Sequence, residues 1–165
     1  VLALQSSGGI ASGPAAGPDH FDVGGASGRP ETLTGVELFG GGFLLFPVRG
    51  HQSSTRFGRY AWALSAEYRF PLALINRGLG AWPLHVDRVI GSFFFDAGNA
   101  WGPDVSPSGF PNARRIRPML TSVGAEVTTE VLGLYNVELR LRTGVAVPLG
   151  EGRGARVYLR IGLPF

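Results

Sequence analysis

RYAWALSAEYRF (residues 59–70) decides the fold, because its residues alternate between two kinds along its whole length. One side of the segment is apolar: Tyr60, Trp62, Leu64, Ala66, Tyr68 and Phe70. The other side is small, polar or charged: Arg59, Ala61, Ala63, Ser65, Glu67 and Arg69. Since successive side chains of a β-strand point to opposite faces of a sheet, this period of two predicts a strand with one apolar and one polar face.

The same alternation returns along the rest of the chain, strongly in some segments and weakly in others. Five further segments are predicted as strands: 1–12, 88–101, 117–130, 137–148 and 156–165. Between them lie the predicted connections, of which 13–58 is the longest and 71–87 is long for a turn. The pattern therefore predicts an all-β, antiparallel sheet of about six strands.

Composition supports strands and turns over helices. The 165 residues include 26 glycines and 12 prolines, which disfavour long helices. No apolar run reaches the roughly 18 residues that a membrane-spanning helix needs, and the first residues lack the basic segment of a signal peptide. Strands of about ten residues with one apolar face nevertheless fit a membrane barrel, whose exterior is apolar and interior polar. A soluble β-sandwich also alternates, and that alternative stays open.

The sequence lacks the motifs of most classes of enzyme and metal-binding protein. The absence of cysteine excludes disulfides, thiolate metal sites and a cysteine nucleophile. His20, His51 and His85 do not have metal-ligand spacing, and no phosphate-binding or nucleophile-elbow motif is present. A net charge of +3 without a recognition motif does not indicate a nucleic-acid partner. We therefore expect a protein that is not an enzyme and uses no metal or cofactor.

Three motifs in order carry a resemblance to a known family. They are FPVRGH (46–51), AEYRFPL (66–72) and SFFFDAGNAW (92–101). Their order and spacing resemble the bacterial surface-antigen, or BamA-type, family of outer-membrane β-barrels. In that family a long outer loop with a Val-Arg-Gly-Phe/Tyr motif folds into the barrel lumen. Its arginine there meets a strand glutamate and the aspartate of a Phe-x-Asp-x-Gly motif.

The resemblance implies a specific set of site residues. The loop-lumen contact would comprise Arg49, Gly50, Glu67 and Asp96, supported by Val48, Phe94 and Gly98. His51 departs from the family pattern, which has an aromatic residue there. The alternation places Glu67 and Asp96 on polar strand faces independently of the resemblance. The alternative is that Arg49 is an ordinary solvated loop arginine.

The final residues suggest a second functional feature. Ile161, Leu163 and Phe165 lie on the apolar side of the segment 156–165. A terminal aromatic on an alternating strand resembles the signal that the outer-membrane assembly machinery recognises. The alternative is that Phe165 packs in a core.

Together these patterns lead to one expectation of architecture. Residues 1–165 are expected to be the C-terminal part of one transmembrane barrel domain, with an extracellular loop at about 13–58. They would supply about six strands of a sixteen-stranded barrel. Because about eight strands are the minimum for closure, the other strands would come from a longer chain or another subunit.

The expected function follows from the resemblance. It is protein assembly or translocation in the bacterial outer membrane, with membrane lipid, unfolded outer-membrane proteins and accessory envelope proteins as partners. One alternative is an outer-membrane anchor for an absent N-terminal enzyme or propeller domain. A second is a soluble β-sandwich binding module.

Overall fold

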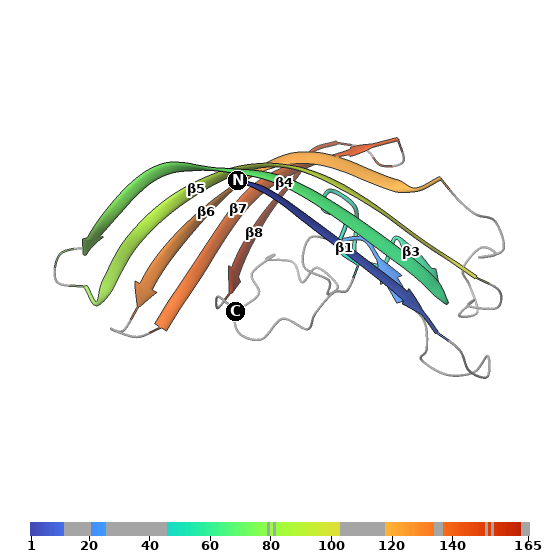
Figure 1. Ribbon diagram of the computed structural model, residues 1–165, viewed down its shortest axis with the longest axis horizontal. Coiled ribbons are helices and arrows are strands. Elements are labelled where there is room, and N and C mark those ends of the chain that lie inside the picture. The colour runs from blue at the N-terminus through green and yellow to red at the C-terminus, as the bar shows by residue number, and fades with distance from the viewer. Residues whose placement is uncertain are drawn as a thin grey trace.

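The main feature of the computed structural model is one curved antiparallel sheet of six strands (Figure 1). The structure describes residues 1–11, 21–25, 46–78, 80, 82–102, 118–133, 137–150, 152 and 154–162. The strands of the sheet are β1 (Leu2–Ile10), β4 (Tyr60–Gly78), β5 (Leu84–Trp101), β6 (Leu120–Gly133), β7 (Val137–Leu149) and β8 (Arg156–Gly162). Among these described residues, no helix is long and apolar enough to cross a membrane.

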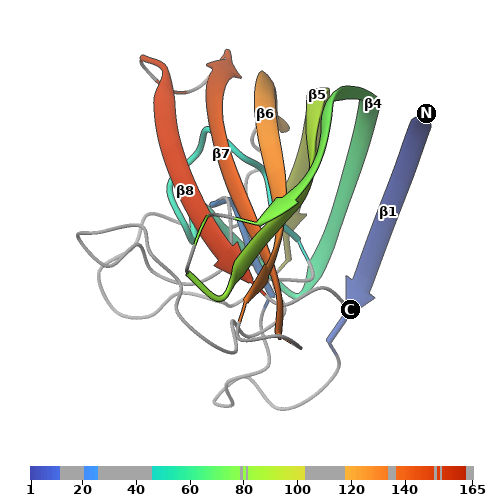
Figure 2. The same ribbon diagram turned by 90° about the vertical axis from the view of Figure 1, so that its left-hand side faces the viewer.

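The strands lie in the order β1-β4-β5-β6-β7-β8, and each is antiparallel to its neighbours. Figure 2 shows them side by side from β8 to β1, with the sheet curled about the strand direction. A curled meander of this kind is part of a β-barrel wall. The predicted all-β, antiparallel fold is therefore confirmed.

The boundary predicted between the second and third strands of the sheet is wrong. Residues 71–87 were expected to be a connection, but β4 continues to Gly78 and β5 begins at Leu84. The pairing register of β4 with β5 shifts between Pro71 and Ala73 and again between Leu74 and Arg77. Each shift adds one residue to β4 relative to β5, so the side chains beyond it continue to alternate but with the two faces exchanged. The connections at this end, after β4 and after β6, are both short.

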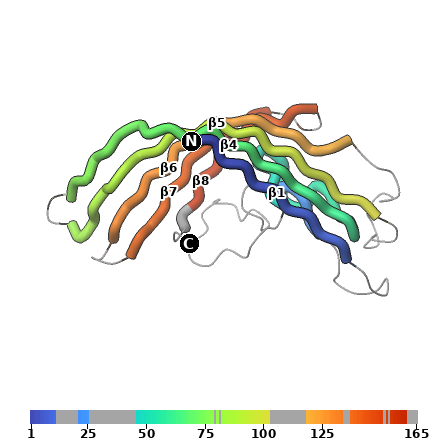
Figure 3. The backbone as a smooth tube through the Cα atoms, in the orientation of Figure 1, coloured from blue at the N-terminus to red at the C-terminus, as the bar shows by residue number. Residues whose placement is uncertain are grey.

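Two short strands lie inside the segment that was predicted as one long loop. β2 (Phe21–Val23) and β3 (Arg56–Gly58) form an antiparallel pair, and Gly25 forms an isolated bridge with Val48. This pair lies beneath the concave side of the large sheet (Figures 1 and 3). The rest of residues 12–45 lies outside the described residues.

The two faces of the large sheet have opposite character. The convex face exposes apolar side chains from all six strands: Leu2, Leu4, Leu64, Tyr68, Phe93, Phe95, Val123, Val127, Val145, Val147 and Val157. The concave face is covered where the loop packs on it. The buried cluster there joins loop and sheet residues: Val23, Phe46, Val48, Ala61, Ala63, Ala100 and Leu120, with Phe21 packed against them. The core of this protein therefore lies between the loop and the inner face.

Candidate functional site: a loop arginine on the inner face of the sheet

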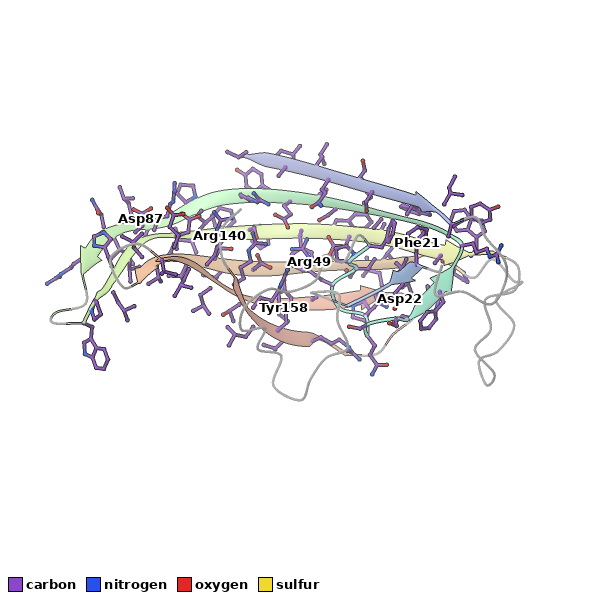
Figure 4. The ribbon with its side chains drawn as sticks, turned by 90° about the horizontal axis from the view of Figure 1, so that it is seen from below. Phe21, Asp22, Arg49, Asp87, Arg140 and Tyr158 are labelled. Carbon is purple, nitrogen blue, oxygen red and sulfur yellow. The ribbon has the colours of Figure 1, made fainter. Side chains whose placement is uncertain are left out.

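A tight turn brings Arg49 onto the inner face of the sheet. The backbone N–H of His51 donates to the carbonyl of Val48 at 3.4 Å. Gly50 has φ of 86°, a left-handed conformation that glycine adopts without strain. A Cβ at Gly50 would also lie 3.2 Å from the Cβ of Ala146 on β7. Glycine therefore allows the turn to approach the sheet closely and direct Arg49 toward its middle (Figure 4).

The strongest contact of Arg49 is with Asp96 on β5. The backbone N–H and the Nε of Arg49 donate to Asp96 Oδ2 at 3.1 and 2.7 Å, and Nη2 donates to Oδ1 at 2.8 Å. Ser65 Oγ donates to the same Oδ1 at 2.7 Å. Asp96 is only 1% exposed. This two-pronged, charge-assisted pairing fixes the guanidinium in orientation as well as position.

Glu67 on β4 holds the other edge of the guanidinium. Arg49 Nη1 donates to Glu67 Oε1 at 2.8 Å, and Arg49 Nη2 donates to Ser65 Oγ at 3.0 Å. The second oxygen of Glu67 accepts from Nε of Arg69 at 2.8 Å. Glu67 therefore lies between two arginines, so its charge is compensated on both sides.

The ring of Phe94 on β5 packs against the guanidinium of Arg49. The Cζ of Arg49 lies 3.6 Å from the ring centroid of Phe94, which is a cation–π contact. The ring packs over Gly124 on β6, where a Cβ would be 2.3 Å from Phe94 Cζ. The glycine therefore makes room for the ring that supports Arg49.

A third carboxylate, Glu126 on β6, also faces the guanidinium. Its Oε2 is 3.6 Å from Arg49 Nη1 and accepts a hydrogen bond from the hydroxyl of Tyr158 at 2.8 Å. Its Oε1 lies 3.8 Å from Arg142 Nη1. Sequence reasoning did not include Glu126 or Tyr158 in the site. The available signal was their position on the polar sides of their strands, which many other residues share.

The charges of the site balance the cost of burying an arginine. Burial alone would lower the pKa of the Arg49 guanidinium. The hydrogen bonds and charge of Asp96, with the charge of Glu67, outweigh this effect and raise the pKa above its usual range. Arg49 therefore stays charged. Within the described ranges, no group of three or more His, Cys, Asp or Glu side chains is arranged to hold a metal ion.

Val48, Gly98 and His51 flank the charged centre. Val48 is fully buried, and its Cγ2 would be 2.8 Å from a Cβ at Gly98 on β5. His51 is 5% exposed, and its Nε2 lies 3.0 Å from the carbonyl oxygen of Thr121 on β6. Because a carbonyl only accepts, Nε2 carries the proton of this bond. His51 thus contacts the sheet through a hydrogen bond. The family that the motifs resemble has an aromatic residue at this position.

The structure brings together the predicted loop and strand residues but not the C-terminal ones. Arg49, Gly50, Glu67 and Asp96 form one connected group, with Val48, Phe94 and Gly98 beside it. Ile161 lies in β8 and pairs with Leu141 of β7, but its side chain is outside the described part of the structure. Leu163 and Phe165 also lie outside them. The proposed C-terminal signal therefore stays a prediction.

The fold and this site together define a segment of β-barrel wall with a loop held against its inner face. A family model for the Omp85 superfamily domain matches residues 19–162, and the chain belongs to this superfamily. No curated protein and no solved structure gives a significant match. Membership is consistent with a bacterial outer-membrane barrel of the assembly or translocation class.

Proposed function

We propose that this chain forms the C-terminal part of an outer-membrane barrel that inserts or translocates other proteins, with its loop docked inside through Arg49. The observation that carries the proposal is the pairing of one loop arginine with carboxylates of adjacent strands on the inner face. We name this group, Arg49 with Ser65, Glu67, Phe94 and Asp96, the Arg49 lock. Burying a guanidinium costs free energy unless carboxylates pair with it. Arg49 reaches these carboxylates only when the loop is docked, so the pairing stabilises the docked loop.

The convex face supports a position in lipid. The ten residue steps from Tyr60 to Phe70 cover about 33 Å at about 3.3 Å per residue, or about 25 Å of height at a tilt of about 40°. This matches the apolar band of outer-membrane barrels. Aromatic rings lie at both of its ends: Tyr60 stacks on Trp101, and Phe70 lies beside Tyr68 and Phe93. Such aromatic girdles are typical of the two membrane interfaces.

The edges of the sheet support a larger barrel. In the part of the chain that the structure describes, β1 pairs only with β4 and β8 only with β7. An open edge in lipid leaves backbone groups unsatisfied at a cost of several kcal/mol each. The resemblance implies a barrel of sixteen strands. We therefore propose that the strands needed to complete it come from the same longer protein or from another subunit.

Reconstitution distinguishes an assembly protein from a membrane anchor. The full-length protein in proteoliposomes is expected to speed the insertion of an unfolded outer-membrane β-barrel substrate at least tenfold over liposomes that contain an unrelated barrel. Insertion is followed by the substrate's resistance to protease. An equal rate in both preparations would favour the anchor for an N-terminal enzyme or propeller domain.

An arginine on the convex face tests the lipid contact. Val123 on β6 is 38% exposed and lies near the middle of the apolar band, because it pairs with Phe95, which in turn pairs with Ala66. Val123→Arg is therefore expected to destabilise the barrel by about 2–4 kcal/mol, as for an arginine at the bilayer midplane. Unfolding in denaturant from lipid vesicles measures this change. Val123→Leu is the matched control and should be nearly neutral. A neutral Val123→Arg would show that this face contacts water, which contradicts the proposed membrane position.

A further inference from the structure

We infer that Glu126 and Tyr158 extend the Arg49 lock to β8, so that docking of the loop also holds this strand in the barrel wall. The inference rests on the proposed function, since it concerns the same docked loop. It assigns a positioning role to two residues that the family motifs do not include.

The connection begins at the guanidinium. Arg49 faces Asp96 on β5 and Glu67 on β4, and Glu126 on β6 lies 3.6 Å from its Nη1. The side chain of Glu126 is 3% exposed, so its charge is compensated by protein groups rather than by water. Arg49 is one of those groups, and it comes from the loop.

Tyr158 carries the connection across β7 to β8. Its hydroxyl donates to Glu126 Oε2 at 2.8 Å. Between the two strands lies Gly144, where a Cβ would be 2.5 Å from the Tyr158 hydroxyl and 2.6 Å from its Cζ. The Tyr158 side chain therefore crosses over this glycine, and its hydroxyl reaches β6, which is not a neighbour of β8. Figure 4 shows Tyr158 on the same face of the sheet as Arg49.

The pairing of β7 with β8 explains why such a connection matters. Arg142 and Arg160 are direct partners in the register and lie on the inner face. Like charges that lie directly opposite in a sheet weaken the pairing of their strands. The bond from Tyr158 to Glu126 offsets this repulsion, since it fixes β8 through β6. In the described residues β8 has no other strand to hold it.

Hydrogen exchange of the β8 amides tests the coupling in the full-length protein in lipid nanodiscs. Tyr158→Phe removes only the hydroxyl, and it is expected to speed exchange at Val157 and Leu159 about tenfold, as for a lost hydrogen bond to a charged acceptor. Arg49→Ala should produce a similar increase in β8. The double variant should exchange no faster than the faster single variant, because both changes break one connection.

A matched control and two outcomes complete the experiment. Tyr60→Phe removes a hydroxyl from the convex face and should leave exchange in β8 unchanged. If Tyr158→Phe and Arg49→Ala act additively, or if Arg49→Ala frees the loop without changing β8, the coupling is wrong while the lock stands. If Arg49→Ala leaves the loop itself protected, the lock fails first, and the two failures are thereby separated.

Discussion

Arg49→Ala is expected to free the segment 46–58 from the inner face and to cost about 3–5 kcal/mol, the loss typical of breaking a buried ion pair. The reason is that Asp96 loses the guanidinium and, once the loop leaves, also the backbone N–H of residue 49, so that among the described residues Ser65 is its remaining donor. Limited proteolysis of the full-length protein in membranes measures the release. Chymotrypsin is the suitable protease, because the variant removes a tryptic site while Phe46 and Phe57 remain.

Two further variants give this prediction its control. Arg77→Ala removes an exposed arginine from β4, and it should leave the loop as resistant as in the unchanged protein. Asp96→Ala should free the loop as fully as Arg49→Ala does. The double variant should be less unstable than the sum of both, because neither member of the Arg49–Asp96 pair is then left without the other. A loop that stays resistant in Arg49→Ala would contradict the lock.

Gly124→Ala is expected to have the second large effect, although it adds a single methyl group. The new Cβ would lie 2.2 Å from the carbonyl oxygen of Val145 and 2.3 Å from Phe94 Cζ. The ring can move, but the carbonyl belongs to the neighbouring strand, so either the β6–β7 pairing or the sheet must shift. A cost of about 3 kcal/mol, the upper part of the usual overpacking range, is expected.

The loss of stability should appear as a lower temperature for the heat-dependent gel mobility of the folded barrel. Gly8→Ala is the matched control, because a Cβ there would meet only the carbonyl oxygen of Ala61 at 3.9 Å. Gly124→Ala should also increase chymotrypsin cleavage of the loop, since Phe94 supports Arg49. Equal stability of the two variants would show that the wall is not tightly packed around Phe94.

The sequence predicted the fold wherever the strands alternate regularly. The predicted segment 59–70 lies in β4 except for Arg59, and its partner 88–101 lies in β5, with Glu67 and Asp96 on the polar side as expected. The prediction failed beyond Pro71, since the register shifts there reverse which residues face inward. It also missed β2 and β3, because strands of three residues are too short to show a period.

The site could be predicted only in part, for a related reason. Family motifs identify Arg49, Glu67 and Asp96, but they carry no information on which side chains meet across several strands. The contact between Tyr158 and Glu126 depends on the register of β6, β7 and β8 and on the missing side chain of Gly144. The packing of Phe46 and Val23 on the sheet likewise depends on how the loop returns. Such contacts follow from three-dimensional pairing rather than from local pattern.

The arrangement of the three carboxylates around Arg49 also implies an order of events during folding. Asp96 is 47 residues from Arg49 in sequence and Glu67 is 18, so these contacts require several strands to be paired first. Until Arg49 arrives, the paired strands carry Glu67, Asp96 and Glu126 close together without this cation. We therefore expect Arg49 to dock after β4, β5 and β6 have paired, because only then do all three carboxylates surround the position of its guanidinium.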